Sequence, residues 1–370
     1  MLCAGIDTLE FGLDIENYHK EFSPFLGHLK ALKEEGQQLG LARTLHINGV
    51  ALIVEKSGMP FYAYRLTCKD FVLGFSEKPT YQNPDIWVKL SSGFLWSYGY
   101  KEAYRRFREW FNHFRVNVLG TRISRVDICL DEDEFPFYPD DKEKFVTKAK
   151  SRAKHEVICE YSEGRELTGF SIGRGKPLLV RIYDKTREIK RSGKTWFEQI
   201  WLENGWDREK PVWRIEFQIR REFLKECSIY TVEDLFEKED GLWAYLTNNW
   251  LELRENIGGN VSRRPLDERW KIVQNAKRKM EVSPLIRERV IQGDIKRLLD
   301  QGVGILCSLG AAANKTSMEE VLEMLKKWGE NKLLKEGITF KDEVQARRQR
   351  FIMFERRRSE VCPKGFNVIP

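Results

Sequence analysis

The chain has 370 residues and a formal net charge of +7, from 63 Lys and Arg residues against 56 Asp and Glu residues. This length exceeds what one compact core usually holds, and the positive balance favours anionic partners such as nucleic acid. Its seven cysteines have no C-x-x-C spacing, no apolar run approaches the roughly 18 residues that span a bilayer, and the N-terminus has no signal pattern. We therefore expect a cytoplasmic protein with reduced cysteines and no membrane anchor.

The first third of the chain mixes strand and helix patterns. Alternating or β-rich stretches predict strands, and an Asn48-Gly49 pair inside one of them predicts a tight hairpin. The strands are expected over residues 6–13, 45–54, 62–66, 71–75 and 85–90, and helices over residues 17–39 and 100–116. This order differs from the regular βα alternation of a doubly wound sheet, so we predict an α+β fold with a mainly antiparallel sheet backed by helices.

Three later runs alternate with the period of a strand and turn polar side chains to one face. Residues 124–131 group Asp127 with Asp131, residues 178–185 group Arg181, Tyr183 and Lys185, and residues 211–220 group Arg214, Glu216, Gln218 and Arg220. If these strands lie side by side, the three polar faces merge into one.

Such a merged face has the groups for phosphodiester chemistry. A phenol with a pKa near 10 is a poor nucleophile at neutral pH, and cations such as Arg181 and Lys185 favour its ionised form and grip a phosphate. Carboxylates are the oxygen ligands that Mg²⁺ or Mn²⁺ prefers. The pattern thus predicts metal-assisted transesterification by Tyr183. The same alternation also fits an ordinary antiparallel sheet with one wet face and a surface tyrosine.

Four motifs occur in an order that resembles the rolling-circle replication initiation factors, a family of plasmid and phage initiators of Gram-positive type and of conjugative-element relaxases. The motifs occupy residues 121–128, 170–174, 180–185 and 213–216, and the resemblance covers roughly residues 4–256. In that family a tyrosine attacks one strand at an origin, keeps the 5′ phosphate as an ester and leaves a 3′ hydroxyl that primes synthesis. The resemblance also implies a host helicase and polymerase as partners.

Carried onto this chain, the resemblance makes Tyr183 the nucleophile and Asp127 and Glu216 the metal ligands. Asp131 and Asp7 are further candidate ligands for Mg²⁺ or Mn²⁺. The paired histidines that hold the metal in many other tyrosine nickases do not occur here, since the five histidines are scattered.

The glycine-rich stretch before Tyr183 is a candidate substrate loop. Arg174 and Lys176 lie between glycines at residues 169–177, where backbone N–H groups and side-chain charge can meet a phosphate. A simple hairpin turn explains the same residues without a ligand. The spacing of an ATP-binding loop is missing, so ATP hydrolysis is not expected. Arg214 and Arg220 complete the expected DNA contacts.

Between the second and third polar runs, aromatic residues at helical spacing predict a helix within residues 188–206. Aromatic rings beside cations can stack unpaired bases, but this spacing favours packing against a core.

After residue 256 the sequence pattern changes and predicts helices that are separated by Gly and Pro residues. We predict a catalytic domain over residues 1–256 and a helical region over residues 257–370, with a hinge at Gly258-Gly259. Basic residues are dense over residues 263–297 and recur over residues 347–348 and 356–358. The helical region is a candidate for DNA binding or for homodimer formation, and a helical pack that only completes the fold remains the alternative.

The functional prediction is a DNA nickase that initiates rolling-circle replication, with origin DNA as its partner. Three alternatives stay open at this point: a conjugative relaxase with the same chemistry, a DNA-binding protein of the same fold without catalysis, and a nuclease whose nucleophile is a metal-bound water.

Overall fold

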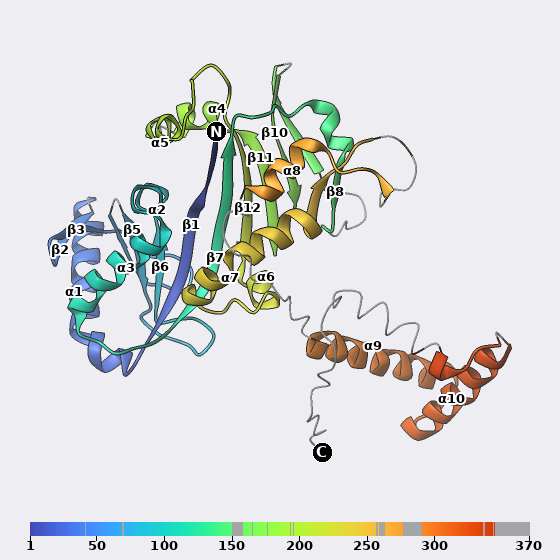
Figure 1. Ribbon diagram of the computed structural model, residues 1–370. Helices are drawn as coiled ribbons and strands as arrows, with labels where there is room; N and C mark the ends of the chain where they lie inside the picture. The colour runs from blue at the N-terminus through green and yellow to red at the C-terminus, as the bar shows by residue number, and fades with distance from the viewer. Residues whose placement is uncertain are drawn as a thin grey trace. The chain divides into compact units, whose positions relative to one another are not determined.

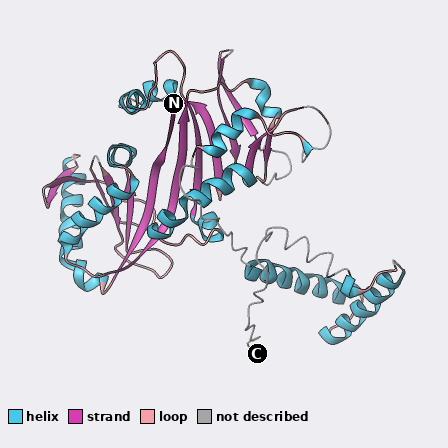
Figure 2. Ribbon diagram, in the orientation of Figure 1, coloured by secondary structure: helices cyan, strands magenta, loops and turns pink. Residues whose placement is uncertain are grey.

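The computed structural model describes residues 1–40, 42–68, 70–149, 158–164, 166–175, 177–192, 194, 196–256, 258, 263–276, 291–335, 337–342 and 344. The chain divides into two compact units, residues 1–289 and residues 290–370. Figures 1 and 2 show a sheet with flanking helices in the first unit and helices in the second.

An eleven-stranded sheet is the centre of the first unit, as described here, and its strands follow the order β2-β3-β4-β5-β6-β1-β7-β12-β11-β10-β9. All the pairings in this order are antiparallel. The strands are β1 (Leu2–Ile15), β2 (Arg43–Ile47), β3 (Val50–Val54), β4 (Tyr64–Thr67), β5 (Phe71–Phe75), β6 (Ile86–Leu90), β7 (Val118–Glu132), β9 (Ile158–Glu163), β10 (Glu166–Gly173), β11 (Leu178–Asp184) and β12 (Trp213–Arg220). The predicted α+β class and antiparallel sheet are confirmed.

One face of the sheet is covered by aromatic contacts from helices. Phe22 of α1 (Tyr18–Leu39) packs on Phe75, and Phe107 of α3 (Tyr100–Phe111) packs edge-on against Phe11. Trp243 of α7 (Val232–Tyr245) meets Phe217 in the same way. These rings belong to one continuous core. Burying each of them removes a large apolar area from water, which stabilises the packing of the helices on the sheet.

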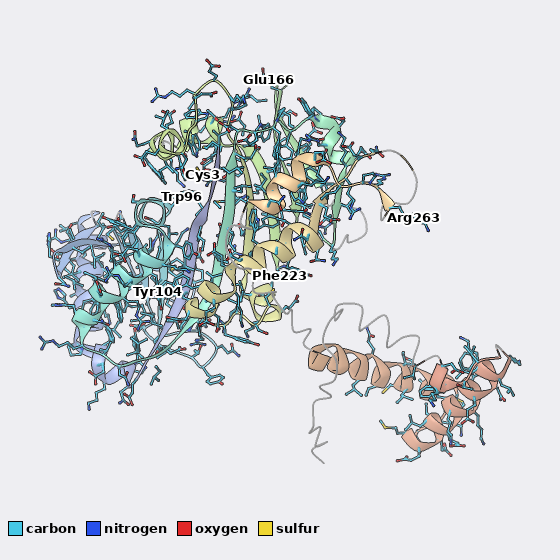
Figure 3. All side chains as sticks on the ribbon, viewed as in Figure 1. Cys3, Trp96, Tyr104, Glu166, Phe223 and Arg263 are labelled. Atoms are coloured by element: carbon cyan, nitrogen blue, oxygen red, sulfur yellow. The ribbon has the colours of Figure 1, made fainter. Side chains whose placement is uncertain are left out.

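The polar face of the sheet carries smaller helical elements at one end. Trp96 of α2 (Ser92–Tyr98) lies close to Gly5, and a Cβ added to Gly5 would stand 2.8 Å from the indole ring of Trp96. The elements α4 (Lys185–Ser192) and α5 (Phe197–Glu203) bring Phe197 and Trp201 into a second apolar cluster with Cys3. Figure 3 labels Cys3 and Trp96, which lie close together beside β1. Both aromatic residues of α5 are fully buried, which agrees with the predicted packing role.

The predicted hairpin about Asn48-Gly49 is confirmed. Strands β2 and β3 pair up to Ile47 and Val50, and the two turn residues have φ angles of 44° and 77°. A two-residue turn with two positive φ angles matches the right-handed twist of the strands, and Asn-Gly adopts it at low cost.

The first unit extends beyond residue 256, where the sequence predicted its end. Helix α8 (Glu268–Asn275) places Trp270 in the main core, and its indole N–H donates to the carbonyl of Thr247 over 2.9 Å. Strand β13 (Leu251–Leu253) pairs with β8 (Phe145–Thr147) and leads the chain there. Other helical elements of this unit are α6 (Arg221–Glu226) and the short turns at residues 112–114, 139–143 and 246–250.

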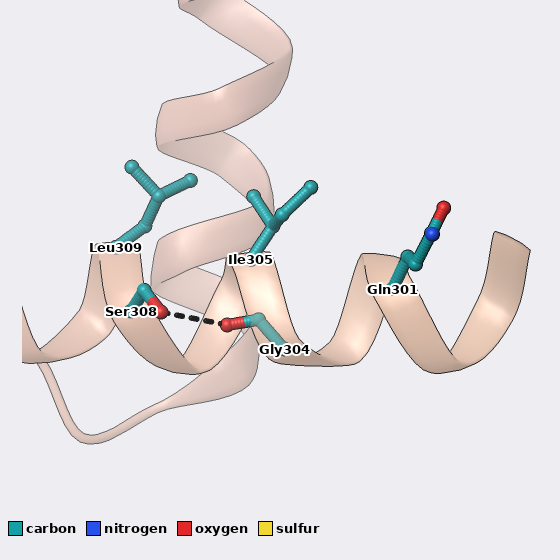
Figure 4. A pocket seen from close by; sticks show the side chains of 5 residues that line it. All are labelled: Gln301, Gly304, Ile305, Ser308 and Leu309. Carbon is teal, nitrogen blue, oxygen red and sulfur yellow. Dashed lines mark hydrogen bonds between the residues drawn. The ribbon is translucent and has the colours of Figure 1, made fainter. Parts of the chain in front are cut away.

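The second unit contains α9 (Ile291–Ala312) and α10 (Met318–Lys335), as the predicted helical region requires. Gly310 of α9 approaches Val321 of α10, where an added Cβ would stand 3.4 Å from the valine side chain. Figure 4 shows Ile305 and Leu309 on one side of α9, and Ser308 Oγ bonding to the Gly304 carbonyl. The predicted hinge residue Gly259, residues 277–290 of the predicted basic stretch and the basic residues at 347–348 and 356–358 lie outside the described residues.

Replacing Trp270 tests the longer first unit. Trp270→Ala should lower the free energy of unfolding of this unit by about 3–5 kcal/mol, because it empties a fully buried site. Urea denaturation measures the loss. Trp328→Ala is the matched control, since Trp328 is 63% exposed on α10 and its removal should change little. An unchanged unfolding midpoint for Trp270→Ala would place α8 outside the cooperative unit.

Candidate active site

The three polar runs lie side by side, which meets the condition under which their polar faces merge. Strand β12 pairs with β7 on one side and with β11 on the other. The register sets Arg181 opposite Glu216 and Tyr183 opposite Arg214. It also sets Arg214 opposite Asp131. Side chains at these positions share one face because facing residues in an antiparallel pair point the same way.

Tyr183 is tied to Glu216. Its hydroxyl donates to Glu216 Oε2 over 2.8 Å, and Arg181 donates to the other carboxylate oxygen. Glu216 is 2% exposed, whereas 42% of the Arg181 side chain faces solvent. The phenol therefore has a proton acceptor in direct contact, and a guanidinium group at the solvent edge lies beside it.

The hydroxyl of Tyr183 is protonated in this arrangement. Burial raises its pKa well above the usual value for a phenol, the charge of Glu216 raises it further, and Arg214 lowers it only in part. We expected Arg181 and Lys185 to favour the ionised form. They do not outweigh burial here, so the raised pKa keeps the phenol in its neutral form at neutral pH.

Lys185 differs from the exposed phosphate clamp that the sequence suggested. It is 1% exposed, pairs with Glu188, and stands 4.8 Å from the centre of the Phe197 ring. Its ammonium group is 5.6 Å from the centre of the Tyr183 ring. Burial and the neighbouring Arg214 lower the pKa of Lys185. Helix α4 begins at Lys185, and this turn of the chain places the ammonium group between the ring of Tyr183 and the ring of Phe197 in α5.

Gly169 explains the glycine motif that precedes Tyr183. Strand β10 pairs with β11 so that Gly169 faces Tyr183. A Cβ at this glycine would stand 2.4 Å from the Ile182 carbonyl oxygen and 2.8 Å from Tyr183 Cβ. Any larger residue would displace the strand that carries the tyrosine.

Asp127 and Glu216 form the first of two carboxylate groups. Arg125 donates to both oxygens of Asp127, over 2.8 Å and 2.5 Å, and also to Gln218 Oε1 over 3.0 Å. Burial nevertheless raises the pKa of Asp127 to about 6, and the charge of nearby Glu216 contributes to the rise. Two hard oxygen ligands thus lie near one another in a site that would gain from an added positive charge.

Asp7 and Asp131 form the second group around Arg214. Arg214 is fully buried, and it donates to Asp7 Oδ1 over 2.8 Å and to Asp131 Oδ2 over 2.7 Å. Trp201 also donates to Asp131 Oδ2 over 2.9 Å, while Ser92 donates to Asp7 Oδ1 over 2.8 Å. Burial alone would raise the pKa of Asp7, but Arg214 holds it well below the usual range.

Two expectations change as a result. Arg214 was predicted to contact DNA, yet it is enclosed and neutralises two carboxylates instead. Asp7 and Asp131 are paired with the fully buried Arg214, which would repel a metal ion. Asp127 and Glu216 are paired with cations too, Arg125 and Arg181, but these side chains are 17% and 42% exposed, and solvent screens their charge. Within the described ranges, no three His, Cys, Asp or Glu side chains converge as a metal site. Sequence alone gave no signal for the role of Arg214, because β1 contributes Asp7 from far along the chain.

The remaining predicted DNA contacts lie at the far end of the strands. Arg174 is exposed in the β10–β11 turn, between Gly173 and Gly175, whose φ angles of 92° and 82° suit glycine. Lys176 lies outside the described residues. Arg220 ends β12 opposite Arg125, and its backbone N–H donates to the Pro177 carbonyl over 2.9 Å. In the described part of the chain no helix is both long and apolar enough to cross a membrane.

The burial of Asp127, with a contribution from the charge of Glu216, predicts a pH effect on stability. A carboxyl whose pKa rises from 3.8 to about 6 on folding stabilises the chain below pH 4 and loses this contribution as the pH rises through 6. Asp127→Asn removes the titration. Between pH 4 and 7 the variant should therefore gain about 2 kcal/mol of unfolding free energy relative to the parent. Urea denaturation measures both profiles. Asp140→Asn, at an exposed aspartate, should follow the parent, and so would Asp127→Asn if the pKa of Asp127 were not raised.

No protein-family model and no curated protein matches this chain. Among solved structures, it is similar to the rolling circle replication initiator protein from Geobacillus stearothermophilus. The TM-score is 0.43 and the sequence identity 14%, over 77% of this chain and 100% of that chain.

Proposed function

We propose that this protein is a DNA nickase that opens one strand through Tyr183 and so initiates rolling-circle replication. The observation that carries the proposal is the contact of the Tyr183 hydroxyl with the buried carboxylate of Glu216, beside the half-exposed Arg181. Nucleophile, base and phosphate contact are the groups that transesterification needs. The order of the four motifs supports the same function.

In the proposed reaction, the Tyr183 oxygen attacks the phosphorus of one phosphodiester. The phenolic proton passes to Glu216, which already accepts its hydrogen bond. The bond from phosphorus to the 3′ oxygen breaks, and this oxygen takes up a proton to become a free 3′ hydroxyl. The 5′ phosphate remains esterified to Tyr183, so the reverse reaction rejoins the strand without ATP.

Arg181 is assigned to the phosphate in this mechanism. Its side chain faces solvent over 42% of its surface while it touches Glu216. A guanidinium group binds phosphate oxygens through paired hydrogen bonds and offsets charge that develops during attack. Lys185 and Arg214 are buried positive charges near the Tyr183 ring, and in this mechanism they favour the phenolate once the phenolic proton has left.

A divalent metal ion fits one of the two carboxylate groups. Asp127 and Glu216 offer oxygen ligands, and burial, with a contribution from the charge of Glu216, raises the pKa of Asp127. Mg²⁺ or Mn²⁺ held there would supply Lewis-acid polarisation of the phosphodiester. Asp7 and Asp131 are assigned instead to Arg214, which they neutralise and fix in place.

The partners follow from the proposed product. A free 3′ hydroxyl is the group that a polymerase extends, and the displaced strand requires a helicase. A conjugative relaxase would use the same residues to send the nicked strand to another cell. The buried contact of Tyr183 with a base favours catalysis over the alternative of a DNA-binding protein without activity.

Tyr183→Phe should abolish both nicking and the covalent adduct while leaving DNA affinity nearly unchanged, because the ring stays and only the nucleophilic oxygen goes. The test incubates the protein with Mn²⁺ and supercoiled plasmid carrying DNA of its own genetic element. Denaturing electrophoresis then shows the nick, and mass spectrometry identifies the peptide that carries a nucleotide.

Tyr161→Phe is the matched control. Tyr161 lies on β9 opposite Gly169 of β10, and it is 54% exposed. It should nick like the parent. Cleavage by Tyr183→Phe without an adduct would indicate a water nucleophile, and an adduct on Tyr161 would reassign the catalytic tyrosine.

The proposed ligand set makes a separate prediction for metal binding. In a Tyr183→Phe background, Asp127→Asn should weaken Mn²⁺ binding by at least about 10- to 100-fold, since it removes a ligand oxygen's charge. Calorimetric titration without DNA measures this. Asp7→Asn should leave Mn²⁺ affinity nearly unchanged, because Asp7 serves Arg214. Equal losses in the two variants would contradict the division of the carboxylates.

A further inference from the structure

A second feature of the same sheet face is a hollow of about 320 Å³ at the end opposite α4 and α5. Its floor includes Arg122 and Ser124 of β7 and Arg220 at the end of β12, and its rim includes Arg221 and Phe61. The volume lies at the lower end of the range of small-molecule pockets, which is roughly 300–1,000 Å³. None of these residues belongs to the candidate active site.

The hollow is positively charged and holds polar atoms without partners. Three arginines and one carboxylate, Glu10, line it. The Nε atoms of Arg122 and Arg220 and the hydroxyl of Ser124 are buried with no hydrogen-bond partner. Buried polar groups are nearly always bonded, because an unpaired donor loses its hydration without compensation. All three side chains line the hollow, and guanidinium and hydroxyl donors suit an anion with several oxygens.

The arginines are held in place by the protein. Arg122 pairs with Asp14 and donates to the carbonyl of Tyr81 over 3.3 Å, and Arg221 donates to the carbonyl of Ile123 over 2.8 Å. Burial lowers the pKa of Arg221, and the charge of Arg122 lowers it further. Two cations kept close against their repulsion gain from a bound anion.

The rim presents an aromatic ring to water. Phe61 is 74% exposed and has a φ angle of 71°, which is rare for a bulky residue. It lies in a tight turn closed by paired backbone hydrogen bonds between Met59 and Tyr62. The turn therefore holds a large apolar surface beside the arginines, where an aromatic base could stack.

We propose that this hollow binds one unpaired nucleotide of the DNA strand, with its phosphate on Arg122 and Arg220 and its base against Phe61. The inference rests on the proposed function, which supplies the strand. The six steps along the backbone from Arg214 to Arg220 span about 20 Å of β12. The hollow thus holds a nucleotide several positions from the phosphate that Tyr183 attacks, and it requires an unpaired base because stacking on Phe61 needs a free face.

Phe61→Gly and Arg220→Gln test the two halves of this site. Glycine accepts the positive φ of residue 61, so the first variant removes the ring without straining the turn. The background is Tyr183→Phe, which cannot become linked to DNA. The probe is fluorescein-labelled oligothymidylate of about 20 nucleotides, a length that exceeds one binding site. Fluorescence anisotropy gives its affinity, and a blunt duplex of the same length is the comparison.

Phe61→Gly should weaken binding of the single strand roughly 5- to 150-fold, with a much smaller effect on the duplex. Arg220→Gln should lessen the slope of log affinity on log salt by about 0.7, as expected for one lost phosphate contact on a single strand. Tyr138→Ala and Arg105→Gln, at exposed residues outside the hollow, are the matched controls and should bind as the background does.

Unchanged single-strand affinity in both Phe61→Gly and Arg220→Gln would overturn the proposal, and so would equal losses for single strand and duplex. The result is independent of catalysis. With Tyr183 intact, absence of any adduct would remove the proposed nickase function, whereas selective loss of single-strand binding in these variants would still establish the nucleotide site.

Discussion

The buried ion pairs of Arg214 are the constraint on which the polar face depends. This guanidinium group has no exposed surface and is shared by Asp7 and Asp131, on the two strands β1 and β7. Removing one partner of such a buried pair costs about 3–5 kcal/mol, because the remaining charge stays unpaired. Trp201 and Ser92 join the same carboxylates, so α5 and α2 are fixed to the sheet by the same charges. Tyr183 lies opposite Arg214 on the neighbouring strand, so the ion pairs that fix Arg214 also fix the position of Tyr183.

In the proposed nicking reaction, the same enclosure explains why Tyr183 would need Glu216. Burial stabilises the neutral phenol, and a neutral phenol is a weak nucleophile. A base in contact with the hydroxyl removes this difficulty only if the proton moves as the new bond forms. The buried cations behind the ring then matter most in the transition state, where negative charge appears on the phenolic oxygen. An arrangement that disfavours phenolate at rest and supports it during attack also limits unproductive reactivity.

Alternation along the chain was enough to predict the three polar strands, their common face and the hairpin at Asn48-Gly49, because these depend on local periodicity and turn chemistry. It did not predict which polar residues are enclosed. Arg214 and Arg220 have the same pattern in sequence, yet only Arg214 is fully buried beneath α5, where its guanidinium carbon is 4.6 Å from the centre of the Phe197 ring, whereas Arg220 is partly exposed. That difference depends on how α4 and α5 cross the sheet. Likewise, Trp270 belongs to the first core only through a tertiary contact with Thr247.

The covering helices make the two ends of the polar face different. α2 and α5 close the end of the sheet that carries Asp7, Asp131 and Arg214, and the side chains there are satisfied by one another. Toward Arg220 the face has buried donors without partners and an exposed ring. Among the described residues, a DNA strand that reaches Tyr183 would therefore find unpaired donors toward Arg220. If the strand follows that side, binding energy from flanking nucleotides would position the phosphate at Tyr183, where small displacements are costly to the rate.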